Sequence, residues 1–423
     1  MTTQSPASEK SIRNLFVKNV MWNTVGTTVY MCCLWMLTII VVWLYDDYLN
    51  AGYFALAMGI TGFFYHIALQ NTRSYQVSDT DGEYTDSEYV SSRVVASIVS
   101  VVLCVIFVFL FDYSAIQRSV VILYMLFRST EAIIDVMHGI DQKHWRMDFI
   151  AISFVIRGIL VLAAFSIFGW LFGLVPAIIG MFVVSASVGL LFDLPKSRKL
   201  AKFTLSIGKP VFLLIKRSLP LMIASLIGVF LISFTRYSVE EIHGTEALGI
   251  YASVAAPSTI MQAMATFVFS PLANVFTAYK ADSNRERFVK LFLLVCAGTL
   301  GISALFYAAA YFFGHWGLTV LFGESIIPHT YLLPGAVIAA GLTAMIWFMS
   351  VIFSITRDIS GLLTGSLIGA ATAILATNFF LIRFGLEGAN HILIASQGAA
   401  VLFLSIRFLS TSKRLLGCQS EHS

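Results

Sequence analysis

The sequence predicts an all-α polytopic membrane protein, with about 12 transmembrane helices arranged as two six-helix bundles. Hydrophobic residues make up 58% of the 423 residues and charged residues only 12%, about half their share in soluble domains. Apolar runs of about 20 residues, the length that crosses a bilayer as a helix, recur along the whole chain. Basic residues gather in alternate segments between these runs, as expected when every second connection faces the cytoplasm.

The expected spans follow one another with short polar connections, and no loop is long enough to fold as a separate domain. The apolar run after the polar N-terminal stretch is too long for a signal-peptide core, so the first span is expected to be retained. A fourth span is expected despite its charged residues, because without it the basic segments would no longer alternate between the two sides of the membrane. In order, the spans are expected at 20–44, 50–70, 93–111, 116–137, 148–168, 170–192, 211–235, 247–270, 290–312, 332–355, 360–382 and 388–409.

The distribution of Lys and Arg predicts the orientation of the chain. Of the 27 Lys and Arg residues, 22 lie in segments that share a side with the N-terminus. Three of the others, Arg118, Arg236 and Arg383, lie on the opposite side, and two, Arg128 and Arg157, fall inside spans. Because Lys and Arg are enriched on the cytoplasmic side of membrane proteins, both termini are expected in the cytoplasm.

A basic stretch, 193–210, follows the sixth span and divides the chain into two expected bundles, 1–200 and 201–423. Similar strings open the second and eighth spans: Gly52-Tyr-Phe-Ala in the first half and Gly249-Ile-Tyr-Ala in the second. Because each half holds an even number of spans, the halves insert in the same orientation. The pattern predicts a parallel repeat about an axis along the membrane normal.

Four charged residues lie within the expected spans. Arg128, Glu131 and Asp135 share one face of the fourth span through i,i+3 and i,i+4 spacing, and Arg157 lies midway along the fifth. Charge at this depth is costly and usually marks a substrate or ion path. Two interpretations stay open and are compatible. One is a buried ion-pair clamp between helices; the other is a water-filled cavity whose arginines bind an anionic substrate while the carboxylates balance charge or couple protons.

No pattern in the sequence indicates a cofactor, a metal site or a nucleotide-binding loop. The five cysteines form no CxxC pair, and there is no Gly-rich phosphate loop followed by Lys-Ser/Thr. His138 and His144 lack a third ligand, so the stretch that begins at His138 is expected to be a solvated interfacial turn. Neither a cofactor nor a metal is expected. The basic excess is explained by membrane topology, and no nucleic-acid partner is expected.

Several stretches in both halves resemble the bacterial polysaccharide, or O-antigen (Wzx-type), flippases. These belong to the MOP superfamily, which also holds multidrug exporters and the lipid II flippase. The strings are short, but their number and order make the resemblance specific. They are Arg73-Ser-Tyr-Gln-Val-Ser-Asp79, Glu83-Tyr84, Arg93, Arg128-Ser-Thr-Glu131-Ala-Ile-Ile-Asp135-Val-Met-His138-Gly139-Ile-Asp-Gln142, Thr235-Arg236-Tyr237, Gly244-Thr-Glu246-Ala-Leu-Gly249-Ile-Tyr251-Ala252 and Phe269-Ser-Pro271-Leu-Ala-Asn274.

The resemblance implies a non-enzymatic flippase in the bacterial cytoplasmic membrane, with two bundles facing across a central cavity. Its substrate would be a polyprenyl diphosphate bearing one oligosaccharide repeat unit, moved to the outer leaflet by alternating access for lipopolysaccharide or other surface polysaccharide. A polysaccharide polymerase and membrane lipid are the implied partners, with coupling to protons or sodium. Under this hypothesis the diphosphate is attracted by Arg128, Arg157, Arg236 and Arg73, while Glu131 and Asp135 balance charge or couple protons.

Two other functions are considered. A cation-coupled multidrug exporter of the same superfamily would need a cavity dominated by carboxylates and apolar surface, without arginine at mid-depth. A membrane glycosyltransferase or polymerase would need a long outer loop carrying paired catalytic residues, and the sequence contains no such loop. Arginine favours the flippase, because its planar guanidinium binds phosphate in a bidentate manner and stays charged.

Overall fold

The computed structural model describes residues 6–45, 47–79, 82–282 and 284–417. Within these ranges every regular element is a helix and no strand occurs, which confirms the all-α prediction. The elements in order are α1 (Pro6–Tyr45), α2 (Tyr48–Leu69), α3 (Thr72–Ser78), α4 (Asp86–Leu110), α5 (Ala115–Lys143), α6 (Met147–Phe172), α7 (Leu174–Val188), the π-helical turn η1 (Gly189–Asp193), α8 (Leu194–Leu200), α9 (Lys209–His243), α10 (Thr245–Ala255), α11 (Ser258–Ala281), α12 (Arg285–Phe322), the 3-10 turn η2 (Glu324–His329), α13 (Leu332–Thr356), α14 (Ile359–Phe384) and α15 (Glu387–Gly417).

Nine helices in the described ranges are long and apolar enough to cross a membrane, and a bent pair within α9 makes a tenth. Pro220 lies inside α9 and removes one backbone donor there, which accounts for the break. Two expected spans fall outside this set. α5 carries Arg128, Glu131 and Asp135 within its apolar stretch. The eighth span is divided into α10 and α11 at Ala256 and Pro257. With these two, the number of spans agrees with the expected count of about 12.

Local sequence explains where several helices begin. Thr85 caps α4 in a capping box with Glu88, and Ser114 caps α5 in the same way with Gln117. α6 and α7 are separated by Gly173 alone, whose φ of 95° lies in a region that glycine adopts without strain. This glycine explains why the fifth and sixth expected spans have almost no connection between them.

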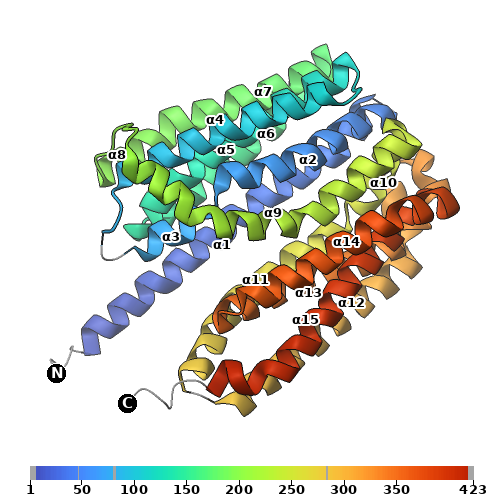
Figure 1. The fold of residues 1–423 in the computed structure, drawn as a ribbon. Helices are drawn as coiled ribbons and strands as arrows, with labels where there is room; N and C mark the ends of the chain where they lie inside the picture. Colours follow the sequence, from blue (N-terminus) through green and yellow to red (C-terminus); the bar gives the residue numbers. More distant parts are fainter. Residues whose placement is uncertain (1–5, 46, 80–81, 283, 418–423) are drawn as a thin grey trace. The chain divides into compact units, whose positions relative to one another are not determined.

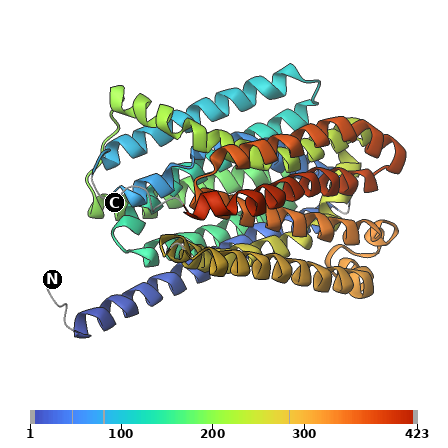
Figure 2. The same ribbon diagram turned by 60° about the horizontal axis from the view of Figure 1, so that its bottom comes forward.

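The chain forms two compact units, of which the first consists of Met1–Asp46 and Ile60–Leu226. In this unit α1 packs along α6, α6 packs against α7, and α5 contacts α4 and α7. Figure 1 shows these helices in the blue-to-green part of the chain, and Figure 2 shows α1 as one long helix. The short helix α3 packs against α5. The charged face of α5 therefore lies among neighbours that can supply partners for it.

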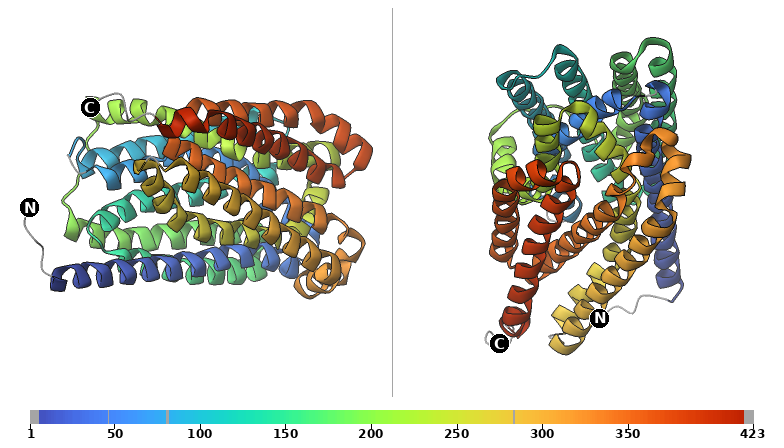
Figure 3. Two further views of the ribbon diagram at one scale, coloured as in Figure 1. Left: turned by 90° about the horizontal axis from the view of Figure 1, so that it is seen from below. Right: turned by 90° about the vertical axis from the view of Figure 1, so that its right-hand side faces the viewer.

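The second unit consists of Asp47–Gly59 and Ile227–Ser423. α13 contacts α10, α11, α12 and α15, while α14 and α15 form a hairpin, visible as the red pair in Figure 3. Its core is rich in aromatic rings, with centroid separations between 4.3 Å for Phe292–Phe408 and 5.9 Å for Phe288–Phe408. Both units take part of α2 and of α9, so the expected division into 1–200 and 201–423 stays a prediction.

The two glycine-containing strings of the expected repeat contact each other within the second unit. A Cβ atom on Gly249 would collide with the backbone of Tyr48 and Gly52, and a Cβ atom on Gly52 would collide with the carbonyl of Thr245. α2 and α10 therefore approach so closely here that only glycine fits at these two positions.

Candidate functional site

Charged side chains of α5 and α6 meet aromatic side chains of α1 and α2 inside the first unit. Glu131 is only 5% exposed, forms an ion pair with Arg128 one turn earlier in α5, and accepts a hydrogen bond from the hydroxyl of Tyr30 on α1. The guanidinium of Arg128 lies over the ring of Tyr65, 3.7 Å from its centroid. We call Tyr30, Tyr65, Arg128, Glu131 and Arg157 the inner arginine cluster.

Arg157 joins this cluster through aromatic contacts. Its side chain is 2% exposed, and its guanidinium lies 4.5 Å from the ring centroid of Tyr30 and 5.3 Å from that of Phe154. Its Nε and Nη1 atoms are buried and have no hydrogen-bond partner in the described part of the chain. Buried guanidinium nitrogens are normally hydrogen-bonded, so these two are free to bind an additional acceptor.

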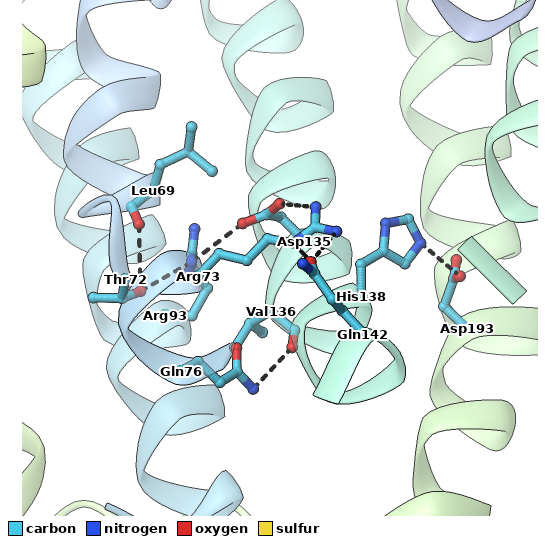
Figure 4. Close-up of polar contacts among 10 residues, drawn as sticks. All are labelled: Leu69, Thr72, Arg73, Gln76, Arg93, Asp135, Val136, His138, Gln142 and Asp193. Carbon is cyan, nitrogen blue, oxygen red and sulfur yellow. Dashed lines mark hydrogen bonds and ion pairs between the residues drawn. The ribbon is translucent and has the colours of Figure 1, made fainter. Parts of the chain in front are cut away.

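Asp135 belongs to a second group of charges, further along α5. It forms ion pairs with Arg73 of α3 at 2.9 Å and with Arg93 of α4 at 3.3 Å. Arg73 also donates to Gln142, and Arg93 donates to Thr72 (Figure 4). We call Arg73, Arg93, Asp135 and Gln142 the Asp135 cluster. Each cluster thus holds two guanidinium groups and one carboxylate, which is an excess of one positive charge.

The structure separates residues that the sequence had grouped together. Arg128 and Glu131 pair as their i,i+3 spacing indicates, and Arg157 is close to them. Asp135 instead forms its ion pairs with arginines of α3 and α4. Arg236 lies on α9 in the second unit, with its side chain half-buried against Gly59 of α2. Its part in substrate binding stays a proposal.

Four members of these clusters were not identified as site residues from the sequence: Tyr30, Tyr65, Arg93 and Gln142. Arg93 was noted in the family resemblance without a role in the site, yet it is fully buried. Its place seven residues into the helix α4, beside an apolar run, was an available signal. Tyr30 lies in an apolar stretch where nothing distinguishes it from a lipid-facing aromatic residue.

The expected solvated turn at His138 is wrong. α5 continues to Lys143, so His138 is still inside the helix, 1% exposed, with Nε2 3.2 Å from Oδ1 of Asp193. Ser153 of α6 donates to the other carboxylate oxygen of Asp193 at 3.0 Å. His144 and Trp145, which follow α5, are exposed as expected.

Comparison with known proteins identifies the family and the fold. The family model "Polysaccharide biosynthesis protein" matches residues 16–276, more than half of the chain. No curated protein matches the sequence.

The fold is similar to solved transporters along nearly the whole chain. A multidrug resistance MATE family transporter of the MOP superfamily in its outward-facing conformation has a TM-score of 0.63 at 16% identity, covering 96% of this chain and 97% of that one. The inward-facing conformation of such a transporter gives 0.64 at 13% identity, with coverages of 94% and 96%. A MOP superfamily transporter from Pyrococcus furiosus gives 0.61 at 15% identity, covering 95% of both chains. The reverse polarity of that protein's binding pocket is reported to suggest a different function.

Proposed function

The chain belongs to the family of polysaccharide biosynthesis proteins, and we propose that it moves a polyprenyl-diphosphate-linked oligosaccharide repeat unit across the bacterial cytoplasmic membrane. The transfer runs from the cytoplasmic to the outer leaflet and supplies the assembly of a surface polysaccharide such as O-antigen. No covalent bond changes in this step, so the protein acts as a transporter and not as an enzyme. Its MOP-superfamily transporter fold supports movement by alternating access.

The observation that carries the proposal is the positive charge of the inner arginine cluster. Arg128 and Arg157 are balanced by one carboxylate, Glu131, and Arg157 keeps two buried nitrogens without a partner. A diphosphate offers several anionic oxygens that match guanidinium groups in charge and geometry. A cationic drug would be repelled at the same place, because the arginines cannot lose their charge at any physiological pH.

The contacts around Arg128 suggest how the headgroup is received. Arg128 is held by Glu131 on its own helix and by the face of Tyr65. A phosphate oxygen can replace Glu131 at Arg128, and Glu131 then keeps its hydrogen bond from Tyr30. Arg128 then exchanges one anionic partner for another, and the carboxylate of Glu131 keeps a hydrogen-bond donor.

The Asp135 cluster and Arg236 are proposed as further contacts for the substrate. The side chain of Arg73 is 26% exposed although it is paired with Asp135, so part of it stays accessible to the substrate. Arg236 lies on a helix of the second unit, and we propose that it too attracts the diphosphate.

Complementation of a strain that lacks this protein tests the proposal. Arg157→Gln and Arg128→Gln are expected to lower surface polysaccharide by at least about tenfold, since each removes charge-assisted hydrogen bonds worth roughly 1.5–3 kcal/mol. Arg146→Gln is the matched control, because Arg146 lies between α5 and α6 and is paired with Asp148 at a partly exposed position. Membrane insertion is measured for every variant. Full surface polysaccharide in the Arg157→Gln strain would contradict the proposal.

The similarity to multidrug transporters makes drug export the second candidate function. Overexpression is expected to leave resistance to cationic drugs unchanged. Resistance that Glu131→Gln abolishes and Arg157→Gln leaves intact would favour the exporter.

A further inference from the structure

A buried histidine–carboxylate pair, which the proposed transport step does not use, joins α5 to the π-helical turn η1. His138 and Asp193 are each 1% exposed, and the carboxylate also accepts a hydrogen bond from Ser153 (Figure 4 shows the pair). Asp193 ends η1, which begins at Gly189, and π-helical turns inside α-helical segments often occur at functional sites. A neutral or charged imidazole fits this geometry, because Nε2 donates to the carboxylate in both forms when it carries the proton.

Asp193 differs from Glu131 and Asp135, the carboxylates of the two clusters, in the side chain that pairs with it. Glu131 is held by Arg128, and Asp135 is held by two arginines. Protonating either carboxylate would leave a guanidinium group without its counter-charge. No Lys or Arg lies within ion-pair distance of Asp193 in the described ranges. Histidine is the side chain whose charge ordinarily changes between about pH 5 and 8, so this pair is suited to taking up and releasing a proton.

The charges that face His138 come from three neighbouring helices. Arg157 of α6 contacts the ring of Phe154 beside His138, and Arg73 of α3 pairs with Asp135, three residues before His138 in α5. Burial and nearby positive charge oppose protonation of an imidazole, whereas the carboxylate of Asp193 favours it. Asp141 lies one turn further along α5, is fully buried, and accepts a hydrogen bond from Ser197 at 3.1 Å. An anion that neutralises Arg157 therefore removes one of the two positive charges that keep a proton away from His138.

Phe154 provides the physical link between this pair and the inner arginine cluster. Its ring lies 5.0 Å from the His138 ring in an edge contact and 5.2 Å from the Tyr30 ring in a stacked contact. The guanidinium of Arg157 lies over the same two rings, of Phe154 and Tyr30. The imidazole and the guanidinium thus contact the same aromatic ring in a buried environment, where charges act strongly on each other.

We propose that the His138–Asp193 pair is a proton-binding site, and that it takes up a proton when the diphosphate headgroup binds to Arg157. This inference rests on the proposed function. The proton comes from solvent and adds to the imidazole. The negative charges of Asp193 and of the anion beside Arg157 then balance the positive charge of the imidazolium. By linkage, protonation of His138 also strengthens headgroup binding to the same extent.

Calorimetry with the purified full chain tests the inference, with farnesyl diphosphate as a short prenyl diphosphate probe. Titrations at one pH near about 7.5, in buffers of different ionisation enthalpy, give the number of protons taken up on binding. Wild-type protein is expected to take up about one proton more than His138→Gln under the same conditions. Because the probe's own protonation is common to both titrations, it cancels in this difference. His144→Gln, an exposed histidine that follows the same helix, is the matched control and is expected to behave as wild type.

The possible outcomes distinguish failure of the proton-binding inference from failure of the proposed headgroup site. Binding with equal proton uptake in wild type and His138→Gln would overturn the inference and leave the proposed function standing. Absence of binding in the wild type would contradict the headgroup site itself, and the inference with it. If His138→Gln does not fold, Asp193→Asn replaces it, and loss of the extra proton is again the supporting result. Zero proton uptake by the wild type, after subtraction of the probe's own protonation, overturns the inference without any variant.

Discussion

The hydroxyl of Tyr30 donates a hydrogen bond to Glu131, which joins α1 to α5 at the level of the Arg128 ion pair. The same ring lies under the guanidinium of Arg157 from α6. One side chain of α1 therefore fixes the positions of both the acidic and the basic members of the inner arginine cluster. This arrangement gives the residue two separable roles, which substitutions can distinguish.

Tyr30→Phe removes the hydroxyl and keeps the ring. We expect a loss of about 1–3 kcal/mol in stability, because a buried carboxylate loses one hydrogen bond. The contact between the ring and Arg157 should persist, so Tyr30→Ala should cost more than Tyr30→Phe. Denaturant titration of the purified proteins measures the loss of stability in both variants. Equal stability of Tyr30→Phe and wild type would show that the hydroxyl does not hold Glu131 in solution.

Arg93→Gln is expected to be among the most destabilising substitutions of an arginine in the chain. Arg93 is fully buried, and its loss would leave Asp135 with one arginine fewer. Breaking a buried ion pair from one side costs about 3–5 kcal/mol. Arg146→Gln removes a partly exposed pair instead and should cost about 1 kcal/mol or less. The yield of folded protein and the denaturation midpoint compare the two, and similar values for both would refute the structural role of Arg93.

Gly249→Ala tests the close crossing of α2 and α10. The added methyl group would collide with the backbone of Tyr48 and Gly52, so a marked loss of stability is expected. Gly301→Ala is the control, because Gly301 lies in α12 with open space around the position of a Cβ atom. There, alanine should stabilise the helix by about 0.5–1 kcal/mol. We therefore expect Gly249→Ala to lower the stability of the protein and Gly301→Ala to raise it.

Asp358 lies between two spans and pairs with Arg407, and this pair predicts a pH dependence of stability. Asp358 caps α14, and hydrogen bonds from Arg407 at 2.7 Å lower the pKa of its carboxyl group below the ordinary value. Because the folded-state pKa is lower than the unfolded-state pKa, this stabilisation is fully present above the unfolded value. It is lost as the pH falls through the folded value.

Thermal unfolding of wild type and Asp358→Asn across the acidic range checks this prediction. The difference in stability between them should be constant above about pH 5 and shrink as the solution becomes more acidic. A difference that grows on acidification would contradict the assigned direction.

The sequence was sufficient for those features that depend on local spacing and composition. Length, hydropathy and basic segments predicted the all-α membrane fold, and i,i+3 spacing predicted the pairing of Arg128 with Glu131. The partners of Asp135 could not be predicted, because they come from α3 and α4 and depend on how these helices pack. The error at His138 has a local cause: α5 runs to Lys143, six residues past the expected end at 137.

The helical spacing of His138 does indicate a buried position. This residue follows Asp135 by three residues and Glu131 by seven, so it lies on the face that carries the other buried charges of α5. Its partner Asp193 comes from the end of η1, in a stretch expected to be a basic loop. Only the packing of η1 beside α5 brings the two together.

Transfer of a fluorescent polyprenyl diphosphate sugar between the leaflets of proteoliposomes is the most direct test of the central claim. The protein is reconstituted as wild type, as Arg157→Gln and as Arg146→Gln, and the fraction of lipid accessible from outside is followed over time. We predict rapid transfer by the wild type and by Arg146→Gln, and a rate at least about tenfold lower for Arg157→Gln. Transfer by Arg157→Gln at the wild-type rate would contradict the claim that buried arginine receives the diphosphate.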